Sequence, residues 1–294
     1  MSYLKEIFPI IAKAGANALL IEYEDMFPYR GKIVNASALN AFTVNQIQEL
    51  LEAAKLHQLE VIPLVQTFGH LEHVLKLEEF VHLREVPNNP QTLCPSKNES
   101  FQLIQMMVDQ IMSLHQGYIK FIHIGSDEVF QLGLCSKCRS RMKLEEKTPK
   151  HLFIGKKINK NACFLNPILH RKTNMTALLF CHYSFLTSFS DHVSKIAQYV
   201  KTQYHVQPII WDDMLRQMNS KELQESQLGN LVEPMVWVYV EDIDHFIDKS
   251  TWSAYGSTFE HVWAASAFKG AFGERLFMPN VFRHYRYVSL NILV

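Results

Sequence analysis

Short apolar runs rich in β-branched residues recur along the chain, and most of them end in polar or aromatic side chains. The central run, residues 118–130, reads Tyr-Ile-Lys-Phe-Ile-His-Ile-Gly-Ser-Asp-Glu-Val-Phe and closes near two adjacent carboxylates, Asp127 and Glu128. Five further runs of this kind occupy residues 18–23, 59–67, 207–211, 235–240 and 261–267. Runs of this length and composition predict six buried β-strands.

Segments with apolar residues three and four positions apart lie between these runs and predict amphipathic helices. The clearest segments are residues 3–16, 43–57, 96–114 and 193–200. Gly15 is predicted to end the first helix, whereas Thr43 and Ser96 are predicted to cap the second and third. A Pro-rich loop, with prolines at positions 87, 90 and 95, is expected before the third helix.

This alternation predicts an α/β fold of parallel strands with the functional site at their carboxyl ends. A (β/α)8 barrel and an open doubly wound sheet both have this arrangement. No glycine-rich phosphate loop follows the first strand, which disfavours a nucleotide-binding sheet. We therefore expect a TIM-type (β/α)8 barrel, although the pattern makes neither the first nor the eighth strand of such a barrel evident.

Two regions depart from the alternation. Residues 150–190 begin basic and Asn-rich and then become apolar without a strand or helix period, which predicts an insertion. Residues 281–294 form an atypical tail where a complete barrel should still supply a helix and a strand. The chain is otherwise interpreted as one domain, residues 1–294.

Composition and charge narrow the range of partners. The chain has 294 residues, of which 48% are hydrophobic, and 29 basic residues balance 29 acidic ones. This balance disfavours a nucleic-acid partner or a membrane surface. Residues 1–11 lack a secretory signal pattern and no apolar run approaches the ~20 residues of a membrane span. We expect a cytoplasmic or nuclear protein with a small or neutral ligand; a homo-oligomer is compatible with the sequence.

The five cysteines are odd in number and scattered, which is typical of reduced thiols rather than of a disulfide framework. Cys135 and Cys138 form a single Cys-x-x-Cys without a matching second pair. Two ordinary loop thiols are therefore favoured over a zinc site.

The adjacent carboxylates at the end of the central run are the main candidates for chemistry. Asp127 and Glu128 are difficult to explain by packing, because two buried carboxylates need specific partners. Successive strand residues face opposite sides, so both can reach one site only if the chain bends, as Gly125 and Ser126 permit. One acid can then stay charged while the pKa of its neighbour is raised, as general acid catalysis requires.

Two histidines lie near predicted strand ends. His70 follows the second strand in Phe-Gly-His and is expected to face a ligand. His123 shares a strand face with Asp127, so it either supports the site or is a core histidine with a satisfied hydrogen bond.

Tryptophans occur at or near the ends of three predicted strands, at Trp211, Trp237 and Trp263. Aromatic walls around polar groups suit the apolar face of a sugar, although any one of these residues alone could belong to the core. Asp212 and Asp213 could bind a metal, bind sugar hydroxyls or cap the next helix, and hydroxyl binding is favoured.

The segment His123-Ile124-Gly125-Ser126-Asp127-Glu128 resembles the His-x-Gly-x-Asp-Glu motif of glycoside hydrolase family 20, the β-N-acetylhexosaminidases. Residues 20–29, 61–70, 211–214 and 263–270 also resemble segments of this family. The resemblance covers about residues 2–149 and 192–280.

The resemblance implies a (β/α)8 barrel and retaining hydrolysis of terminal N-acetylgalactosamine or N-acetylglucosamine from a glycan or glycoconjugate. The substrate's own 2-acetamido group would be the nucleophile, so no metal or organic cofactor is needed. Glu128 would protonate the leaving oxygen and later activate water, and Asp127 would orient the acetamido group. The implied substrate-binding residues are Trp211, Trp237 and Trp263 as pocket walls and His70, Asp212 and Tyr239 as polar contacts.

Two other classes of function remain open on the sequence. One is a non-catalytic sugar-binding or interaction protein that retains the pocket motifs. The other is a metal-dependent hydrolase using His70, His123 and the aspartates, which the absence of a metal-ligand spacing disfavours.

Overall fold

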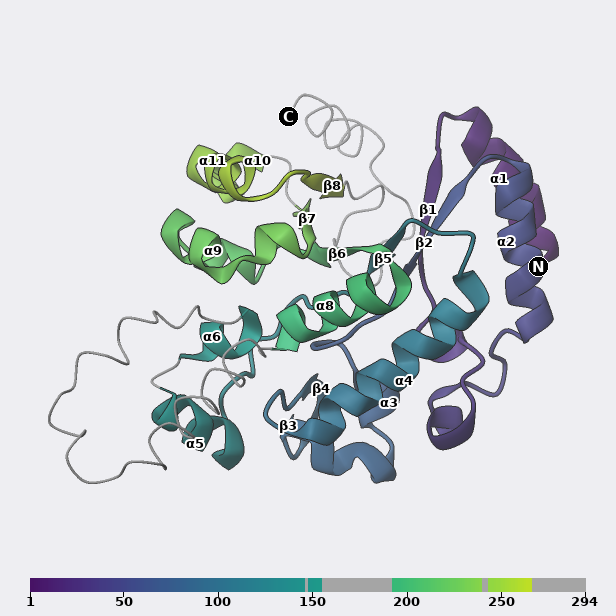
Figure 1. Cartoon of the computed structure of the whole chain (residues 1–294). Helices are drawn as coiled ribbons and strands as arrows, with labels where there is room; N and C mark the ends of the chain where they lie inside the picture. Colours follow the sequence, from purple (N-terminus) through teal and green to yellow (C-terminus); the bar gives the residue numbers. More distant parts are fainter. Residues whose placement is uncertain (146–147, 155–191, 240–242, 266–294) are drawn as a thin grey trace, which may run out of the picture. The chain divides into compact units, whose positions relative to one another are not determined.

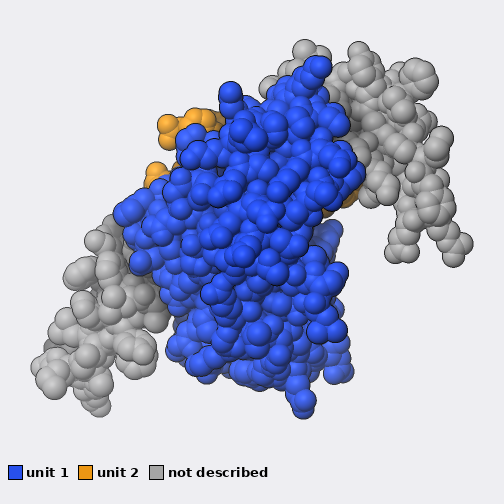
Figure 2. Space-filling model, turned by 90° about the vertical axis from the view of Figure 1, so that its right-hand side faces the viewer, with its two compact units in different colours: residues 1–208 blue, residues 209–294 orange. Residues whose placement is uncertain are grey.

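The computed structural model (Figure 1) describes residues 1–145, 148–154, 192–239 and 243–265. These residues group into two compact units, residues 1–208 and residues 209–294 (Figure 2). Each unit contributes parallel strands, so the prediction of an α/β fold with parallel strands is confirmed.

Unit 1 contains three parallel strands in the order β1 (Ala18–Glu22), β2 (Glu60–Leu64) and β5 (Phe121–His123). Its helices are α1 (Ser2–Lys13), α2 (Val44–Leu56), α3 (Glu72–Leu75), α4 (Asn98–His115), α5 (Ser136–Leu144), α6 (Pro149–Ile154) and α8 (His192–Tyr204), with 3-10 turns at Glu24–Met26, Gly31–Ala36 and Glu78–Leu83. Because the strands are parallel, their carboxyl ends share one edge. Polar residues that follow each strand therefore meet there.

The predicted helix ends are confirmed in two of three cases. Thr43 caps α2 through a capping box, because its hydroxyl accepts from the Gln46 N–H at 3.2 Å and the Gln46 side chain accepts from the Thr43 N–H at 2.8 Å. Gly15 follows the end of α1 with a φ of +103°, a conformation that suits glycine. The prediction for Ser96 is wrong, since α4 begins at Asn98 and Lys97 occupies the cap position.

The predicted Pro-rich loop contains an antiparallel hairpin instead, formed by β3 (Arg84–Val86) and β4 (Asn89–Leu93). This hairpin supports the loop that follows β2. The Leu93 N–H donates to the Phe68 carbonyl at 3.1 Å, and the Leu71 N–H donates to the Gln91 carbonyl at 3.1 Å. The two hydrogen bonds lie on either side of His70 in the sequence.

Unit 2 contains β6 (Gln207–Trp211, whose first two residues belong to unit 1), β7 (Glu233–Trp237) and β8 (Trp263–Ala265), again parallel and in that order. Its helices are α9 (Ser220–Ser226), α10 (Ile243–Phe246) and α11 (Lys249–Thr258), with 3-10 turns at Leu215–Gln217 and Leu228–Asn230. All six predicted strands are therefore present among the described residues. A complete barrel has eight such strands.

The two regions that break the alternation fall mostly outside the described residues. Residues 150–154 belong to α6, where Leu152 and Phe153 are buried and the Phe153 ring stacks on Phe68 with centroids 5.5 Å apart. Residues 155–190 and the tail at 281–294 are not described. Over the part of the chain that is described, no helix combines the length and apolar character needed to cross a bilayer.

Candidate active site

The chain bends sharply directly after β5 and so brings both carboxylates to one side. His70 Nε2 lies 3.1 Å from Glu128 Oε2 and 3.5 Å from Asp127 Oδ2. The bend passes through three residues of positive φ, namely Gly125 (+62°), Ser126 (+72°) and Glu128 (+50°). His70 itself has a φ of +52°, so strained backbone is concentrated around the acid pair, as is common at functional sites.

Two glycines allow the loops after β2 and β5 to approach each other closely. A Cβ on Gly125 would lie 2.1 Å from Gln66 Oε1, and a Cβ on Gly69 would lie 2.3 Å from the Asp127 carbonyl oxygen. The Thr67 hydroxyl donates to the Ile124 carbonyl at 2.7 Å. The position of the carboxylates thus depends on direct contact between these two loops.

Gln66 contacts both the bend and the Asp127 carboxylate. Its Nε2 donates to Asp127 Oδ1 at 3.1 Å, and its Oε1 accepts from the Ser126 N–H at 3.3 Å. Burial raises the pKa of Asp127, whereas His70 and the Gln66 hydrogen bond act in the opposite direction. Burial and the neighbouring Glu24 also raise the pKa of Glu22 at the end of β1.

The acids differ in exposure, which suits different roles. The Asp127 side chain is 16% exposed and the Glu128 side chain is 39% exposed. The less exposed acid is held by an amide, whereas the more exposed one reaches solvent beside His70. A partly buried acceptor next to a more accessible acid is an arrangement that supports proton transfer to a bound ligand.

The two predicted histidines have different surroundings. His70 lies beside the acid pair with 30% of its side chain exposed, and its expected contact with a ligand stays a prediction. His123 is fully buried, its Nδ1 accepts from the Gly125 N–H at 3.0 Å, and burial lowers its pKa to about 3. His123 is therefore a neutral core histidine that supports the bend.

Sequence analysis missed the residues that hold the acid pair in place, chiefly Gln66 and Thr67. Both are buried, and His192 of α8 fixes this segment further through a 2.7 Å contact between its Nε2 and the Thr67 carbonyl. The polar pair after an apolar strand was visible in the sequence. The residues that hold the two carboxylates in place lie about 60 residues away in the sequence, so the pattern around the acid pair did not identify them.

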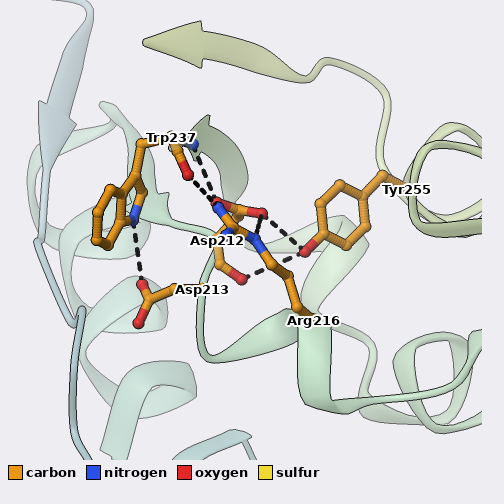
Figure 3. A network of polar contacts seen from close by, with 5 residues as sticks. All are labelled: Asp212, Asp213, Arg216, Trp237 and Tyr255. Atoms are coloured by element: carbon orange, nitrogen blue, oxygen red, sulfur yellow. Dashed lines mark hydrogen bonds and ion pairs between the residues drawn. The ribbon is translucent and has the colours of Figure 1, made fainter. Parts of the chain in front are cut away.

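In unit 2, Asp212 is the centre of a buried polar network (Figure 3). Arg216 donates to it twice, from Nε at 2.6 Å and from Nη2 at 2.5 Å, and also donates to the Trp237 carbonyl. The Tyr255 hydroxyl donates at 3.1 Å and the Trp237 N–H at 3.2 Å. Asp212 is fully buried, so these contacts support the ends of β6 and β7. Its predicted contact with a sugar hydroxyl stays a prediction.

Three aromatic side chains gather at the carboxyl ends of β6 and β7. Trp211 and Trp237 end these strands and meet edge to face with centroids 6.4 Å apart. Tyr239 lies 5.3 Å from Trp237 and is 49% exposed. The Trp237 indole donates to Asp213 at 3.3 Å, so this acid orients an aromatic ring.

Trp263 is the first residue of β8, whose described part ends at Ala265. Its indole donates at 2.6 Å to Glu233, the first residue of β7. The predicted contact of Trp263 with a sugar stays a prediction.

Among the described residues, one group of side chains has the spacing of metal ligands, namely Glu85, Cys94, Cys135 and Cys138. The interpretation of Cys135 and Cys138 as two loop thiols is wrong in one respect, because Cys138 lies within α5, and Cys94 lies beside both sulfurs. The group includes neither the two predicted histidines nor the aspartates. The geometry therefore does not support the metal-dependent hydrolase.

Comparisons with known proteins give a family match and two similar relatives. Residues 8–249 match the model of the glycosyl hydrolase family 20 catalytic domain. The chain is 38% identical over 286 residues to hexosaminidase D of Bos taurus and 39% identical over 288 residues to hexosaminidase D of Homo sapiens. Both alignments cover 97% of this chain, but they span 72% of the bovine protein and only 52% of the human one.

Solved structures show the same fold at low sequence identity. The β-N-acetylhexosaminidase of Bacteroides fragilis NCTC 9343 superposes with a TM-score of 0.55 at 16% identity, over 83% of this chain and 44% of that one. The family 20 enzyme of Streptomyces coelicolor A3(2) gives 0.51 at 13% identity, over 91% and 45%. The fold is thus the TIM type, and its six described parallel strands fit an incomplete (β/α)8 barrel.

Proposed function

This chain belongs to glycosyl hydrolase family 20, and from that premise we propose that it is an exo-acting, retaining β-N-acetylhexosaminidase. Its substrates are glycans or glycoconjugates that end in N-acetylgalactosamine or N-acetylglucosamine. The observation that carries the proposal is the acid pair, in which Asp127 and Glu128 reach the same histidine within 3.5 Å.

Glu128 is proposed as the general acid and base. Its proton passes to the glycosidic oxygen while the bond from that oxygen to C1 breaks, and the acetamido carbonyl oxygen bonds to C1 from the opposite face. This gives an oxazolinium intermediate. Water then attacks C1 as Glu128 takes its proton and the bond from C1 to the acetamido oxygen breaks, so the product keeps the original configuration.

Asp127 is proposed to orient the acetamido group. Gln66 occupies Oδ1, which leaves Oδ2 directed toward the same side as Glu128. A carboxylate there accepts a hydrogen bond from the acetamido N–H and stabilises the positive charge that develops on the oxazolinium ring. Because burial raises the pKa of Asp127, this role is lost on acidification sooner than it would be for an exposed aspartate.

The aromatic cluster of unit 2, Trp211, Trp237 and Tyr239, is proposed to contact sugar rings. Indole rings suit the apolar face of a hexosamine, and Asp213 holds the Trp237 indole in position. Replacing Trp237 by leucine is expected to raise KM more than it lowers kcat, because stacking contributes to binding in both the ground state and the transition state.

The proposal is tested with aryl N-acetyl-β-glucosaminides and N-acetyl-β-galactosaminides. Glu128→Gln is expected to lower kcat on these aryl substrates, because Glu128 also activates water in the second step, whereas Glu52→Gln, on the exposed face of α2, serves as the matched control. Substrates with a fluorinated acetamido group should react more slowly with the unsubstituted protein, because their carbonyl oxygen is a weaker nucleophile. No turnover, or turnover unaffected by Glu128→Gln, would refute the proposal.

A sugar-binding protein without catalysis is the alternative that the same preparation can detect. The chain spans only about half of its human relative, so an intact acid pair does not by itself establish turnover. Calorimetry with a stable oxazoline mimic distinguishes the two functions. Tight binding without hydrolysis of any aryl substrate would indicate the binding protein.

A further inference from the structure

Three cysteines and one glutamate, distant in the sequence, converge in unit 1. The sulfur of Cys94 lies 3.4 Å from that of Cys135 and 3.6 Å from that of Cys138, and Glu85 Oε2 lies 3.2 Å from the Cys138 sulfur. All four ligand atoms lie within 4.8 Å of one another. Three of the residues are buried, and Cys135 is partly exposed. We propose that these four side chains form a structural zinc site.

The separations fit tetrahedral coordination. With zinc–sulfur bonds of about 2.3 Å, tetrahedral ligands lie about 3.8 Å apart, and a carboxylate oxygen lies slightly closer to its sulfur neighbours. The observed sulfur separations of 3.4 and 3.6 Å and the sulfur–oxygen distance of 3.2 Å are close to this pattern. Thiolate-rich tetrahedral sets favour zinc over magnesium, calcium or manganese, and four protein ligands make the site a structural one.

A disulfide explains the cluster less well. A disulfide has a sulfur separation of about 2.05 Å, and it would use only two of the three thiols. The third thiol and Glu85 would remain together in the interior. Among the residues that the structure describes, no lysine, arginine or histidine is paired with Glu85, although a buried carboxylate normally needs a cationic partner or a metal.

The surrounding polar groups orient the ligands. Glu85 Oε1 accepts from the backbone N–H groups of Leu134 at 2.6 Å and Cys135 at 2.9 Å, which directs Oε2 toward the thiols. The Cys138 N–H donates to the Cys135 sulfur at 3.2 Å, and the Ser96 hydroxyl lies 3.1 Å from the Cys138 sulfur. These N–H groups lie at the start of α5, where they help to offset the negative charge of three thiolates and a carboxylate.

The site would join two segments that hold the acid pair. Glu85 lies on β3, and Cys94 directly follows β4, the strand that hydrogen-bonds on both sides of His70. Cys135 and Cys138 begin α5, and Cys135 follows Glu128 by seven residues. Zinc would therefore fasten the loop that carries His70 to the segment after the carboxylates, without touching a substrate.

The test uses the full chain, expressed with added zinc and purified under reducing conditions. Elemental analysis is expected to find about one zinc ion per chain. Replacement by Co²⁺ should give sulfur-to-cobalt charge-transfer absorption and the intense visible bands of a tetrahedral ion. Cys94→Ser and Cys138→Ser should lose both signals, whereas Glu52→Gln, which replaces an exposed acid of α2, should keep them.

Glu85→Cys keeps the proposal testable even where a serine variant fails to fold. It supplies a fourth thiolate, so it should retain the metal and increase the charge-transfer intensity per cobalt. The proposal would be overturned by reduced, folded protein that binds neither Zn²⁺ nor Co²⁺, by a cobalt spectrum that persists in Cys138→Ser, or by mass spectrometry that finds a disulfide between Cys94 and Cys135 in protein purified without reductant.

Discussion

Replacing Gly69 by alanine tests whether contact between two loops positions the acid pair. The new Cβ, whose position is fixed by its own backbone, would lie 2.3 Å from the Asp127 carbonyl oxygen, which is a backbone atom rather than the end of a flexible side chain. Contacts below 3.0 Å essentially do not occur for a Cβ, so one loop must move by at least about 0.7 Å. His70 directly follows the substituted residue, and Asp127 carries the clashing carbonyl oxygen, so the displacement reaches both side chains.

The expected result is a large loss of rate with a moderate loss of stability. A misplacement of about 1 Å costs on the order of 100-fold in kcat, and overpacking costs about 1–3 kcal/mol of unfolding free energy. Steady-state kinetics on an aryl N-acetyl-β-hexosaminide would be measured together with a guanidinium unfolding curve on the same sample. The curve gives the fraction of folded protein by which kcat is normalised.

Gly229→Ala is the matched control. Its Cβ would lie 2.0 Å from the Thr258 carbonyl oxygen, an equally severe backbone clash at the amino side of β7 in unit 2. It should lose comparable stability while kcat per folded molecule stays near the unsubstituted value. A folded Gly69→Ala variant with unchanged kcat, or equal losses of kcat in both variants, would refute the reasoning.

Three further substitutions test other parts of the account. Gln66→Leu removes a hydrogen bond that favours ionised Asp127, so the pKa of Asp127 should rise further. As the pH is lowered, kcat/KM of this variant should begin to fall at a higher pH than that of the unsubstituted protein; a pH profile with an unshifted acidic side would contradict this. Asp212→Ala removes the buried carboxylate that accepts from Arg216 and from the Tyr255 hydroxyl and should lower the unfolding free energy by about 3 kcal/mol, measured by urea unfolding; a loss no larger than that of an exposed substitution would contradict it. Thr43→Ala should cost about 1 kcal/mol by loss of the capping box and leave kcat unchanged, whereas a changed kcat would show that the α2 cap affects the site.

The parts of the fold that follow from local pattern were predictable from the sequence. Strand β6 has the predicted bounds, 207–211, because a short apolar run ends directly at two acids. The cap of α2 followed from Thr43, a residue type that favours the N-cap position. The acid pair at the end of β5 was identified because two carboxylates after an apolar run conflict with simple packing.

The missed features depend on contacts between distant segments. Strands β3 and β4 are short, and Pro87 and Pro90 predicted a loop; the hairpin forms because β4 also hydrogen-bonds to the loop around His70. Cys94 lies 41 residues from Cys135, so the metal-ligand spacing appears only once that hairpin has folded.

The central claim is that Glu128 supplies the proton to the leaving group, and the most direct measurement compares leaving groups. For Glu128→Gln, kcat/KM would be measured on an aryl N-acetyl-β-hexosaminide whose leaving group needs little protonation and on a disaccharide whose leaving group needs much. The account predicts a loss of about 10² to 10⁴ on the disaccharide and a clearly smaller loss on the aryl substrate. Equal losses on both substrates, or none, would contradict the assignment of Glu128.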